Sequence, residues 1–413
     1  MKSRERVLAS INHKEPDHIP IDMGSTPSSG ISAIAYGKLK KYLKIESGHT
    51  WVYDVCQQLA QPEDVILDRF RIDIADIGRM FNNEDKDWHD VKLSDGSSAQ
   101  YPVWFNSVEQ PDGSHIAYLK DGRPAAKMPV GATFFDQLIF PYINGYPDNY
   151  KNLSNDISKV HWSAFAHSPW DHSSEDDFWK QLREKAQQLR KTSDRAIMLV
   201  IGCNLFEWGT FLRRIDNFLM DIYTEQDEVE RFLDAIMELH MVNLEKACAS
   251  VGDLVDIIRF GDDLGMDSGP FMSPDVYRKL FKPRHKMLCD YVRKHSKMYT
   301  FLHSCGSLYK LIPDLIEAGY DILNPVQTSC KDMEPEKIKK EFGKDITIWG
   351  AGADTRFVLN RATPLEVKEH VKRRIEIFAP GGGFVFNTIH NIMPDVPPEN
   401  IIAMFEAIGE YGK

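Results

Sequence analysis

The chain has 413 residues and a formal net charge of -11 at pH 7. This acidic balance leaves no basic surface to bind a phosphate backbone, so we expect no nucleic acid partner. Six cysteines without a CxxC pair indicate reduced thiols in a cytoplasmic protein. No apolar run reaches membrane-spanning length, and the charged N-terminal segment lacks the apolar core of a signal peptide, so no membrane partner is expected.

The first 80 residues predict a short helix followed by two strands. The helix places Val7, Leu8 and Ile11 on one face. The sequence IPIDMG then predicts a strand that ends near Asp22, and RIDIADIGR, residues 71–79, predicts a second one.

The stretch from about residue 80 to 190 interrupts the alternation of strand and helix. Asp-Gly turns in DGSSAQYPVWF and DGSHIAYLKDGRP flank short alternating runs, which predicts a β-hairpin or a small meander. Aromatic side chains then become dense: Phe134, Phe135, Phe140, Tyr142, Tyr146, Tyr150, Trp162, Phe165, Trp170, Phe178 and Trp179. They either pack beneath the insertion or roof a pocket for a flat substrate, and we expect residues 80–190 to form a substrate cap.

From residue 195 onward, short apolar runs alternate with helical patterns. Runs of this length between helices are typical of buried parallel strands. They cover residues 197–203, 255–263, 298–306, 321–327, 346–354 and 383–391. With the two earlier strands they make eight, which predicts an α/β fold: one (β/α)8 TIM barrel domain over residues 1–413, with an N-terminal helical extension and a β-hairpin and aromatic-rich insertion.

Residues able to bind metal or move protons stand at the ends of these runs. Chemistry gathered at the C-terminal ends of successive parallel strands is typical of a TIM barrel active site. The residues are Cys203 and Glu207, Asp262 and Asp263, His303 and Cys305, Asn324 and Gln327, Asp354, and His390 and Asn391.

His303 and Cys305 are candidate zinc ligands. They are two residues apart on a strand, so both side chains leave the same face. A neutral imidazole and a thiolate are natural ligands of zinc. His390 adds a third ligand, because a closed barrel brings the strand ends together around its mouth. The alternative is a buried cysteine beside a histidine that is hydrogen-bonded in a loop.

Glu207 is a candidate for a fourth, exchangeable oxygen ligand of the metal. The same residue is equally explained as a glutamate at a helix start, where the helix dipole favours it. Cys203 competes with it because it lies closer to the strand end, whereas Cys330 in a polar loop is interpreted as incidental.

Asp262 and Asp263 are adjacent, so on an extended segment they point to opposite sides and cannot both face a pocket. We expect one to orient the substrate together with Asn324 and Gln327, and the other to cap the following turn. These four residues are the candidate catalytic residues. The sequence PGGGF, residues 380–384, precedes the last strand and predicts a tight turn at the stability face of the barrel, not a phosphate site.

Several stretches of the chain resemble the uroporphyrinogen decarboxylase superfamily, and in particular its zinc-dependent methyltransferases that act with corrinoid proteins. They are RERVLASINHKEPDHIPID, GDDLG with SPDVYRKLFKPRHK, HSCGSLYKLIPDLIEAGYDILNPVQ, ITIWGAGADT and HNIMPDVPPENIIAM. The resemblance covers nearly the whole chain outside residues 80–190.

This resemblance also indicates what the substrate is not. Members that decarboxylate uroporphyrinogen carry an arginine-rich segment after the first strand, whereas PIDMGSTPSSGIS has no arginine here. Members that methylate a small thiol use a His-x-Cys pair, matched by His303 and Cys305, and a later cysteine, where this chain has His390. An imidazole in place of a thiolate makes the metal site less negative, which favours polarising a leaving oxygen or nitrogen on a methyl donor.

We therefore expect a zinc-dependent methyltransferase that moves a methyl group between a small-molecule donor or acceptor and a separate protein that carries a corrinoid (cobalamin). The aromatic insertion favours a methoxylated aromatic as the donor. One alternative is a metal-independent decarboxylase that acts on a smaller acid, and another is an inactive barrel that serves as a corrinoid-binding partner or scaffold. The sequence does not determine the oligomeric state, and a homodimer is one expectation.

Overall fold

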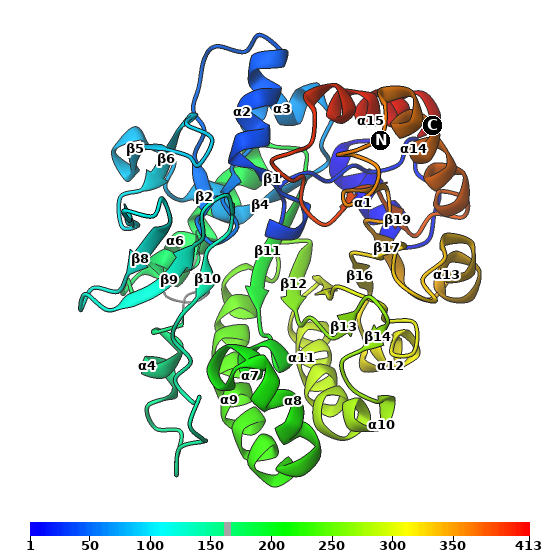
Figure 1. Cartoon of the computed structure of the whole chain (residues 1–413). Coiled ribbons are helices and arrows are strands. Elements are labelled where there is room, and N and C mark those ends of the chain that lie inside the picture. The colour runs from blue at the N-terminus through cyan, green and yellow to red at the C-terminus, as the bar shows by residue number, and fades with distance from the viewer. Residues whose placement is uncertain (161–166) are drawn as a thin grey trace.

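The computed structural model describes residues 1–160 and 167–413 and contains a barrel of parallel strands (Figure 1). Seven strands form one sheet in the order β19-β17-β16-β15-β12-β11-β4. The IPIDMG segment closes it, because Ile21 pairs in parallel with Phe386 beyond β19 and accepts a hydrogen bond from the N–H of Asp73 before β4 (2.8 Å). The predicted TIM barrel is confirmed. Its strands are β4 (Ile74–Asp76), β11 (Ala196–Gly202), β12 (Ile257–Gly261), β15 (Tyr299–His303), β16 (Ile322–Asn324), β17 (Thr347–Trp349) and β19 (Phe384–Val385).

Apolar side chains of the N-terminal helix α1 (Ser3–Ile11) fill one end of the barrel. Val7 and Ile11 belong to the same interior cluster as Ile257 of β12 and Phe301 of β15. Ile258, the neighbour of Ile257, faces outward into the larger core beneath the helices. This alternation means that every second residue of a barrel strand points inward.

Helices follow the strands and cover the outside of the barrel (Figure 1). A π-helical turn, Tyr277–Phe281, lies immediately before α11. Within the described residues, no helix combines the length and the apolar character needed to cross a bilayer. The helices are α2 (Ala33–Tyr42), α3 (Asp64–Arg69), α6 (Phe178–Thr192), α7 (Phe206–Arg213), α8 (Ile215–Thr224), α9 (Gln226–Val251), α10 (Pro274–Val276), α11 (Lys282–His295), α12 (Ile312–Ala318), α13 (Pro335–Phe342), α14 (Pro364–Phe378) and α15 (Pro398–Tyr411).

Short strands accompany the barrel outside the main sheet. β1 (Ile31–Ser32), β2 (Val52–Asp54) and β3 (Leu59–Ala60) form an antiparallel sheet, and β13 (Gly265–Met266) pairs with β14 (Gly269–Pro270). β18 (Ala353–Asp354) pairs in parallel with β20 (Thr388–Ile389), beyond the C-terminal ends of β17 and β19.

The insertion lies between β4 and α6. It contains a hairpin of β5 (Trp88–Lys92) and β6 (Ser98–Pro102), a helix α4 (Leu153–Ile157), and a sheet ordered β10-β9-β8-β7, with β7 (Ser107–Glu109), β8 (His115–Tyr118), β9 (Pro124–Met128) and β10 (Asp136–Gln137). The predicted Asp-Gly turns are present, since Gly96, Gly113 and Gly122 have φ of 81°, 80° and 82°. The insertion ends at about residue 177 and not at residue 190 as expected, because α6 packs on α9 as one of the barrel helices.

Much of the aromatic segment packs against a barrel helix. The rings of Tyr142 and Tyr150 lie 6.3 and 6.0 Å from that of Phe232 on α9, centroid to centroid. These side chains therefore anchor the insertion. Trp162 and Phe165 lie outside the described residues.

The last part of the insertion reaches the C-terminal end of β11. The indole N–H of Trp170 donates to the carbonyl oxygen of Val200 (2.6 Å), and the ring of His167 packs edge-on against Tyr53 of β2 at 5.6 Å. This end of the insertion is placed to border the mouth of the barrel.

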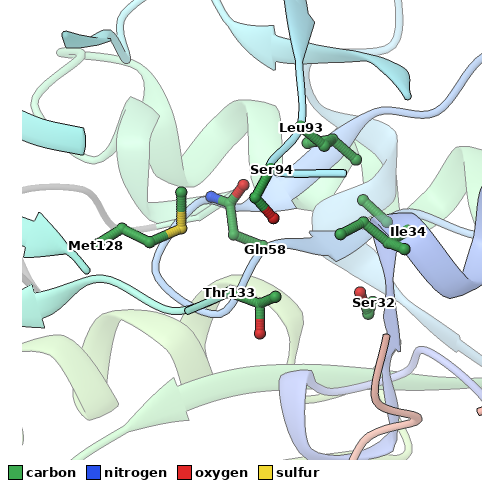
Figure 2. Close-up of a pocket in the computed structure, with 8 residues that line it drawn as sticks. Ser32, Ile34, Gln58, Leu93, Ser94, Met128 and Thr133 are labelled. Carbon is green, nitrogen blue, oxygen red and sulfur yellow. The ribbon is translucent and has the colours of Figure 1, made fainter. Parts of the chain in front are cut away.

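A small cavity lies where the insertion meets the start of the barrel (Figure 2). Its volume of about 10 Å³ is roughly the space of one water molecule. Gln58, Leu93, Met128 and Thr133 are among the residues that line it, and none of them is an acid or a base. This cavity is a packing detail and not the site of the chemistry.

The PGGGF segment forms a tight turn at the end of the barrel that α1 closes, as predicted. Gly381, Gly382 and Gly383 have φ of 78°, 71° and 69°, values that favour glycine. A Cβ on Gly382 would lie 2.7 Å from backbone atoms of Lys14, so the turn packs directly on the segment after α1.

Candidate metal centre

His303 ends β15 and points into the barrel, in alternation with the interior residue Phe301. The side-chain N–H of Asn324 donates to the carbonyl oxygen of Trp349 (3.1 Å), which can only accept, so Asn324 Oδ1 faces His303 Nδ1 (2.9 Å). His303 Nδ1 therefore carries the proton, and Nε2 keeps a free lone pair. Burial lowers the pKa of His303 to about 3, which keeps the ring neutral.

Cys305 follows on a loop that is held from both sides. Its Sγ lies 3.7 Å from His303 Nε2, and its backbone N–H donates to Asp263 Oδ1 (2.8 Å). A Cβ on Gly306 would lie 2.3 Å from the backbone of Gly265, so the HSCG and GDDLG loops touch directly. Burial raises the pKa of the Cys305 thiol, and nearby carboxylates add to this shift.

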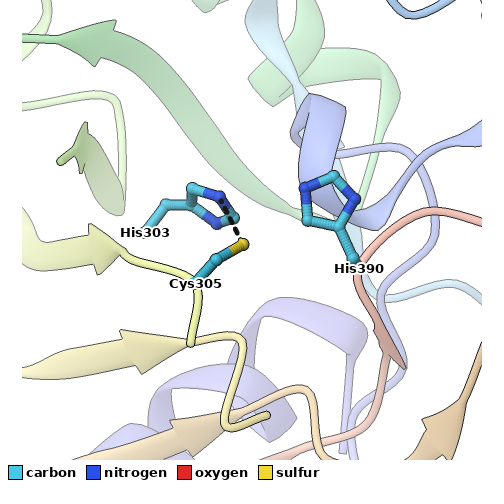
Figure 3. Close-up of side chains that lie close together, drawn as sticks. All are labelled: His303, Cys305 and His390. Carbon is cyan, nitrogen blue, oxygen red and sulfur yellow. Dashed lines mark hydrogen bonds between the residues drawn. The ribbon is translucent and has the colours of Figure 1, made fainter. Parts of the chain in front are cut away.

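His390 faces the other two side chains from across the mouth (Figure 3). Its φ of 68° is unfavourable for a residue with a side chain, and strain of this kind tends to gather at functional sites. The ring centroids of His303 and His390 are 5.5 Å apart, and the candidate ligand atoms of His303, Cys305 and His390 lie within 4.8 Å of one another. Burial also lowers the pKa of His390.

These three residues fit a zinc ion. Ligand atoms of a tetrahedral zinc site are roughly 3.3 to 3.8 Å apart, given Zn–N near 2.0 Å and Zn–S near 2.3 Å. The His303–Cys305 separation of 3.7 Å already lies in this range. His390 needs a movement of about 1 Å to complete the set.

Glu207 lies on the first turn of α7 and outside the three-ligand group. Its carboxyl oxygen accepts a hydrogen bond from the side-chain amide of Asn204. Burial raises the pKa of Glu207 to about 8, and the neighbouring Asp263 adds to the shift. Asp263 Oδ1 lies 3.6 Å from His303 Nε2, which makes it a second oxygen donor beside the group.

Cys203, the competing candidate ligand, and Cys330, which the sequence indicated to be incidental, both lie apart from the group. Cys203 belongs to the outer core, beyond the barrel interior. The thiol of Cys330 donates to Asp267 (3.4 Å). Neither is among the described residues that could share a metal with His303.

Asp262 faces away from the mouth, which corrects its expected contact with substrate. Its carboxylate accepts hydrogen bonds from the backbone N–H groups of residues 205–207 (2.9 to 3.2 Å) and contacts His285 Nε2 (3.1 Å). It therefore caps the N-terminus of α7, and not the turn that follows it. As the alternation predicts, its neighbour Asp263 faces the site.

Gln327 and Asn324 form hydrogen bonds that hold the metal-ligand residues in place. Gln327 Oε1 accepts a hydrogen bond from the backbone N–H of Gly306 (2.8 Å) and so fixes the turn after Cys305. Asn324 sets the tautomer of His303. Both are positioning residues in this geometry.

Three further polar side chains at the mouth were not predicted from the sequence. Asp76 ends β4, burial raises its pKa to about 6, and its Oδ1 has no partner in the described part of the chain. The buried hydroxyl of Tyr53 likewise has none. Arg259 lies within β12, two residues after the interior residue Ile257. A charge inside an apolar strand was a usable signal for Asp76 and Arg259, whereas Tyr53 carries no periodic signal.

Comparison with known proteins agrees with this fold. A family model described as uroporphyrinogen decarboxylase (URO-D) matches residues 203–411. A uroporphyrinogen decarboxylase from Methylococcus capsulatus is 29% identical over 97 residues, which is 24% of this chain and 26%, about a quarter, of that protein. A methyltransferase from Methanosarcina mazei superposes with a TM-score of 0.59 at 16% identity over 100% of this chain and 99% of that chain, which shows the fold. A B12-independent methionine synthase from a Shewanella species aligns with a TM-score of 0.35 at 12% identity over 96% and 95% of the chains, too weakly to carry an argument.

Proposed function

The chain belongs to the uroporphyrinogen decarboxylase family, and from this membership we propose that it is a zinc-dependent methyltransferase that exchanges a methyl group between a small molecule and a corrinoid protein. The observation that carries this proposal is the group of His303, Cys305 and His390 at the barrel mouth. Two neutral imidazoles and a thiol are a donor set that suits zinc.

The chain's own residues prepare the metal position. Asn324 keeps the His303 proton on Nδ1, so Nε2 is available as a ligand. Cys305 must lose its proton to become a ligand, and its raised pKa means that the thiolate forms together with binding of a cation. Gln327 and Asp263 hold the loop that directs the thiol. Zinc bound there supplies a Lewis acid that polarises the oxygen or nitrogen bearing the methyl group.

We propose a methoxylated aromatic as the donor class. Support comes from the flat side chains that border the mouth, namely Tyr53, His167 and Trp170. The proposed role of the insertion as a substrate cap rests on this last part of it, since Tyr142 and Tyr150 pack against α9.

Uroporphyrinogen is disfavoured as a substrate. The segment after the first strand holds buried hydroxyl groups that bond to one another and to the barrel: Thr26 Oγ1 and Ser28 Oγ are 2.7 Å apart, and Ser28 donates to Asn324 (3.0 Å). No cation stands there to pair with the eight carboxylates of a porphyrinogen, and unpaired buried carboxylates are costly.

A metal-independent decarboxylase of a smaller acid is the second candidate, and Asp76 is the observation in its favour. A buried carboxyl with a pKa of about 6 and a free oxygen can donate a proton to the carbanion that remains when carbon dioxide leaves.

The test is an absorbance assay with a reduced corrinoid protein and a panel of methyl donors. We expect conversion of cobalt(I) to methyl-cobalt(III), methoxylated aromatics acting better than methylamines, and loss of conversion in Cys305→Ser but not in the control Cys330→Ser. Turnover of uroporphyrinogen without a corrinoid, or full conversion by Cys305→Ser, would contradict the proposal. Release of carbon dioxide from a small acid by metal-free protein, abolished by Asp76→Asn, would favour the decarboxylase.

A further inference from the structure

Arg259 is a buried cation without a partner inside the barrel. It lies on the inward face of β12, in alternation with Ile257, and its side chain is of intermediate exposure. Its guanidinium makes no hydrogen bond or salt bridge with any described residue, and its Nε is fully buried. Burial lowers the pKa of Arg259, but a guanidinium keeps its proton in proteins and so cannot escape this cost.

The nearest carboxylates do not satisfy Arg259. Glu207 and Asp263 are the acidic residues with the strongest electrostatic effect on it. Neither forms a hydrogen bond or salt bridge with Arg259 in the described structure: Asp263 accepts from the backbone N–H of Cys305 (2.8 Å), and Glu207 accepts from the side chain of Asn204. The planar fork of Arg259 N–H groups is therefore left for another acceptor.

The absence of a side chain at Gly261 leaves room for the guanidinium. A Cβ at this position would lie 2.8 Å from Arg259 Nη1 and 2.9 Å from Asn204 Nδ2. Gly261 directly precedes the Asp262–Asp263 pair at the end of β12, so Arg259 Nη1 is directed toward the mouth and the metal-ligand group.

Two more buried donors at the mouth lack acceptors. The Tyr53 hydroxyl and the Asn387 side-chain N–H group have no hydrogen-bond partner in the described part of the chain. Tyr53 is an electrostatic neighbour of Arg259, and Asn387 follows β19. Unmatched donors on separate elements of the mouth, together with an unpaired cation, indicate a ligand that is rich in acceptors and negatively charged.

We propose that Arg259 binds a carboxylate of the substrate, so that the small molecule in the proposed methyl transfer is a carboxylic acid. A carboxylate matches the guanidinium fork with two parallel hydrogen bonds, and the low-dielectric site strengthens this pairing. The inference rests on the proposed function for the reaction at this site, but binding of the acid is measurable without the reaction.

The experiment is calorimetric titration of the full chain, free of zinc and corrinoid, with acetate, benzoate and 4-methoxybenzoate and with the neutral amide of each. We expect at least one acid to bind about tenfold or more tightly than its amide. Arg259→Gln should abolish this preference, and Arg259→Lys, which keeps the charge but not the fork, should retain part of it. The control Arg373→Gln removes an exposed arginine that pairs with Glu336 (2.8 Å) and should change nothing.

Unfolding measurements on the variants without ligand separate a carboxylate-binding role of Arg259 from a structural role. Arg259→Gln should be at least as stable as the wild type, because it removes an unpaired buried charge. If Arg259→Gln does not fold, Arg259→Lys takes its place, and its preference for the acid should be weaker than that of the wild type.

The inference is overturned if the wild type prefers no acid over its amide, or if the preference survives in Arg259→Gln. Acid binding without methyl-cobalt formation contradicts the proposed methyl transfer alone. Methyl transfer from neutral donors with no acid preference contradicts the Arg259 inference alone.

Discussion

The two ends of the barrel interior are filled by different kinds of side chain. At the N-terminal end, Val7 and Ile11 of α1 close the barrel against apolar strand residues. At the C-terminal end, Asp76, Arg259 and Tyr53 each bury a polar atom that has no partner among the described residues.

This difference separates stability from function within one core. Apolar packing at the closed end favours folding and contributes no chemistry. Buried polar groups without partners oppose folding, and they are tolerated where a ligand completes them. Substitutions at the closed end should therefore destabilise the fold, whereas substitutions at the mouth should leave the fold intact and impair ligand binding.

The largest effect on folding is expected at the closed end. Ile11→Ala should lower the free energy of unfolding by about 2 to 5 kcal/mol, because it leaves a cavity beneath the barrel. Leu365→Ala, at a side chain that is 70% exposed, should change it by no more than about 0.5 kcal/mol. Urea denaturation measures both. Equal effects would show that α1 is not a closing element.

Asp76 should lower the free energy of unfolding by an amount that depends on pH. Its folded-state pKa of about 6 lies above the ordinary 3.8, so between these values the folded chain holds a proton that the unfolded chain has released. The free energy of unfolding contributed by this group therefore falls as pH rises through that window. Asp76→Asn avoids the loss and should gain up to about 3 kcal/mol over the wild type at pH 7, with little gain near pH 4.

Urea unfolding of the wild type and of Asp76→Asn at both pH values checks this prediction. A stability difference that does not depend on pH would mean that the carboxyl of Asp76 finds a partner in solution.

A smaller effect, on zinc affinity, is expected at Asn324, which contacts the metal ligand His303. Asn324→Ala should weaken zinc binding by about 10- to 100-fold, because the His303 ring loses the acceptor that holds its proton on Nδ1. Ser28→Ala removes another hydrogen bond to the same Asn324 oxygen without touching His303, and is the matched control. Competition with a chelator measures both affinities. Equal affinity in Asn324→Ala and the wild type would rule out this positioning role.

The fold was more predictable from the sequence than the site. Apolar runs and helical spacing are local patterns, and they located the barrel strands, including the short IPIDMG segment. Alternation also showed that Asp262 and Asp263 must face opposite ways. It could not show which one faces the mouth, because that depends on how residues 205–207 are placed by the folded barrel.

Long-range partners explain what the sequence did not reveal. His390 is brought to His303 by closure of the barrel, and the resemblance to a known family supplied this pairing, not local spacing. The charge of Arg259 inside an apolar run is a local signal, but its lack of a partner is visible only in the folded chain. Tyr142, Tyr146 and Tyr150, three of the aromatic residues expected to roof the pocket, pack instead against Phe232 on α9, which is distant in sequence.

Zinc content tests the metal centre most directly. The purified wild type, His390→Cys and the control Cys330→Ser should each hold about one zinc per chain, because each keeps three nitrogen and sulfur ligands at the mouth. His303→Ala, Cys305→Ser and His390→Ala should lose the metal while remaining folded. Full zinc content in both His303→Ala and Cys305→Ser, or no zinc in the wild type, would contradict the account.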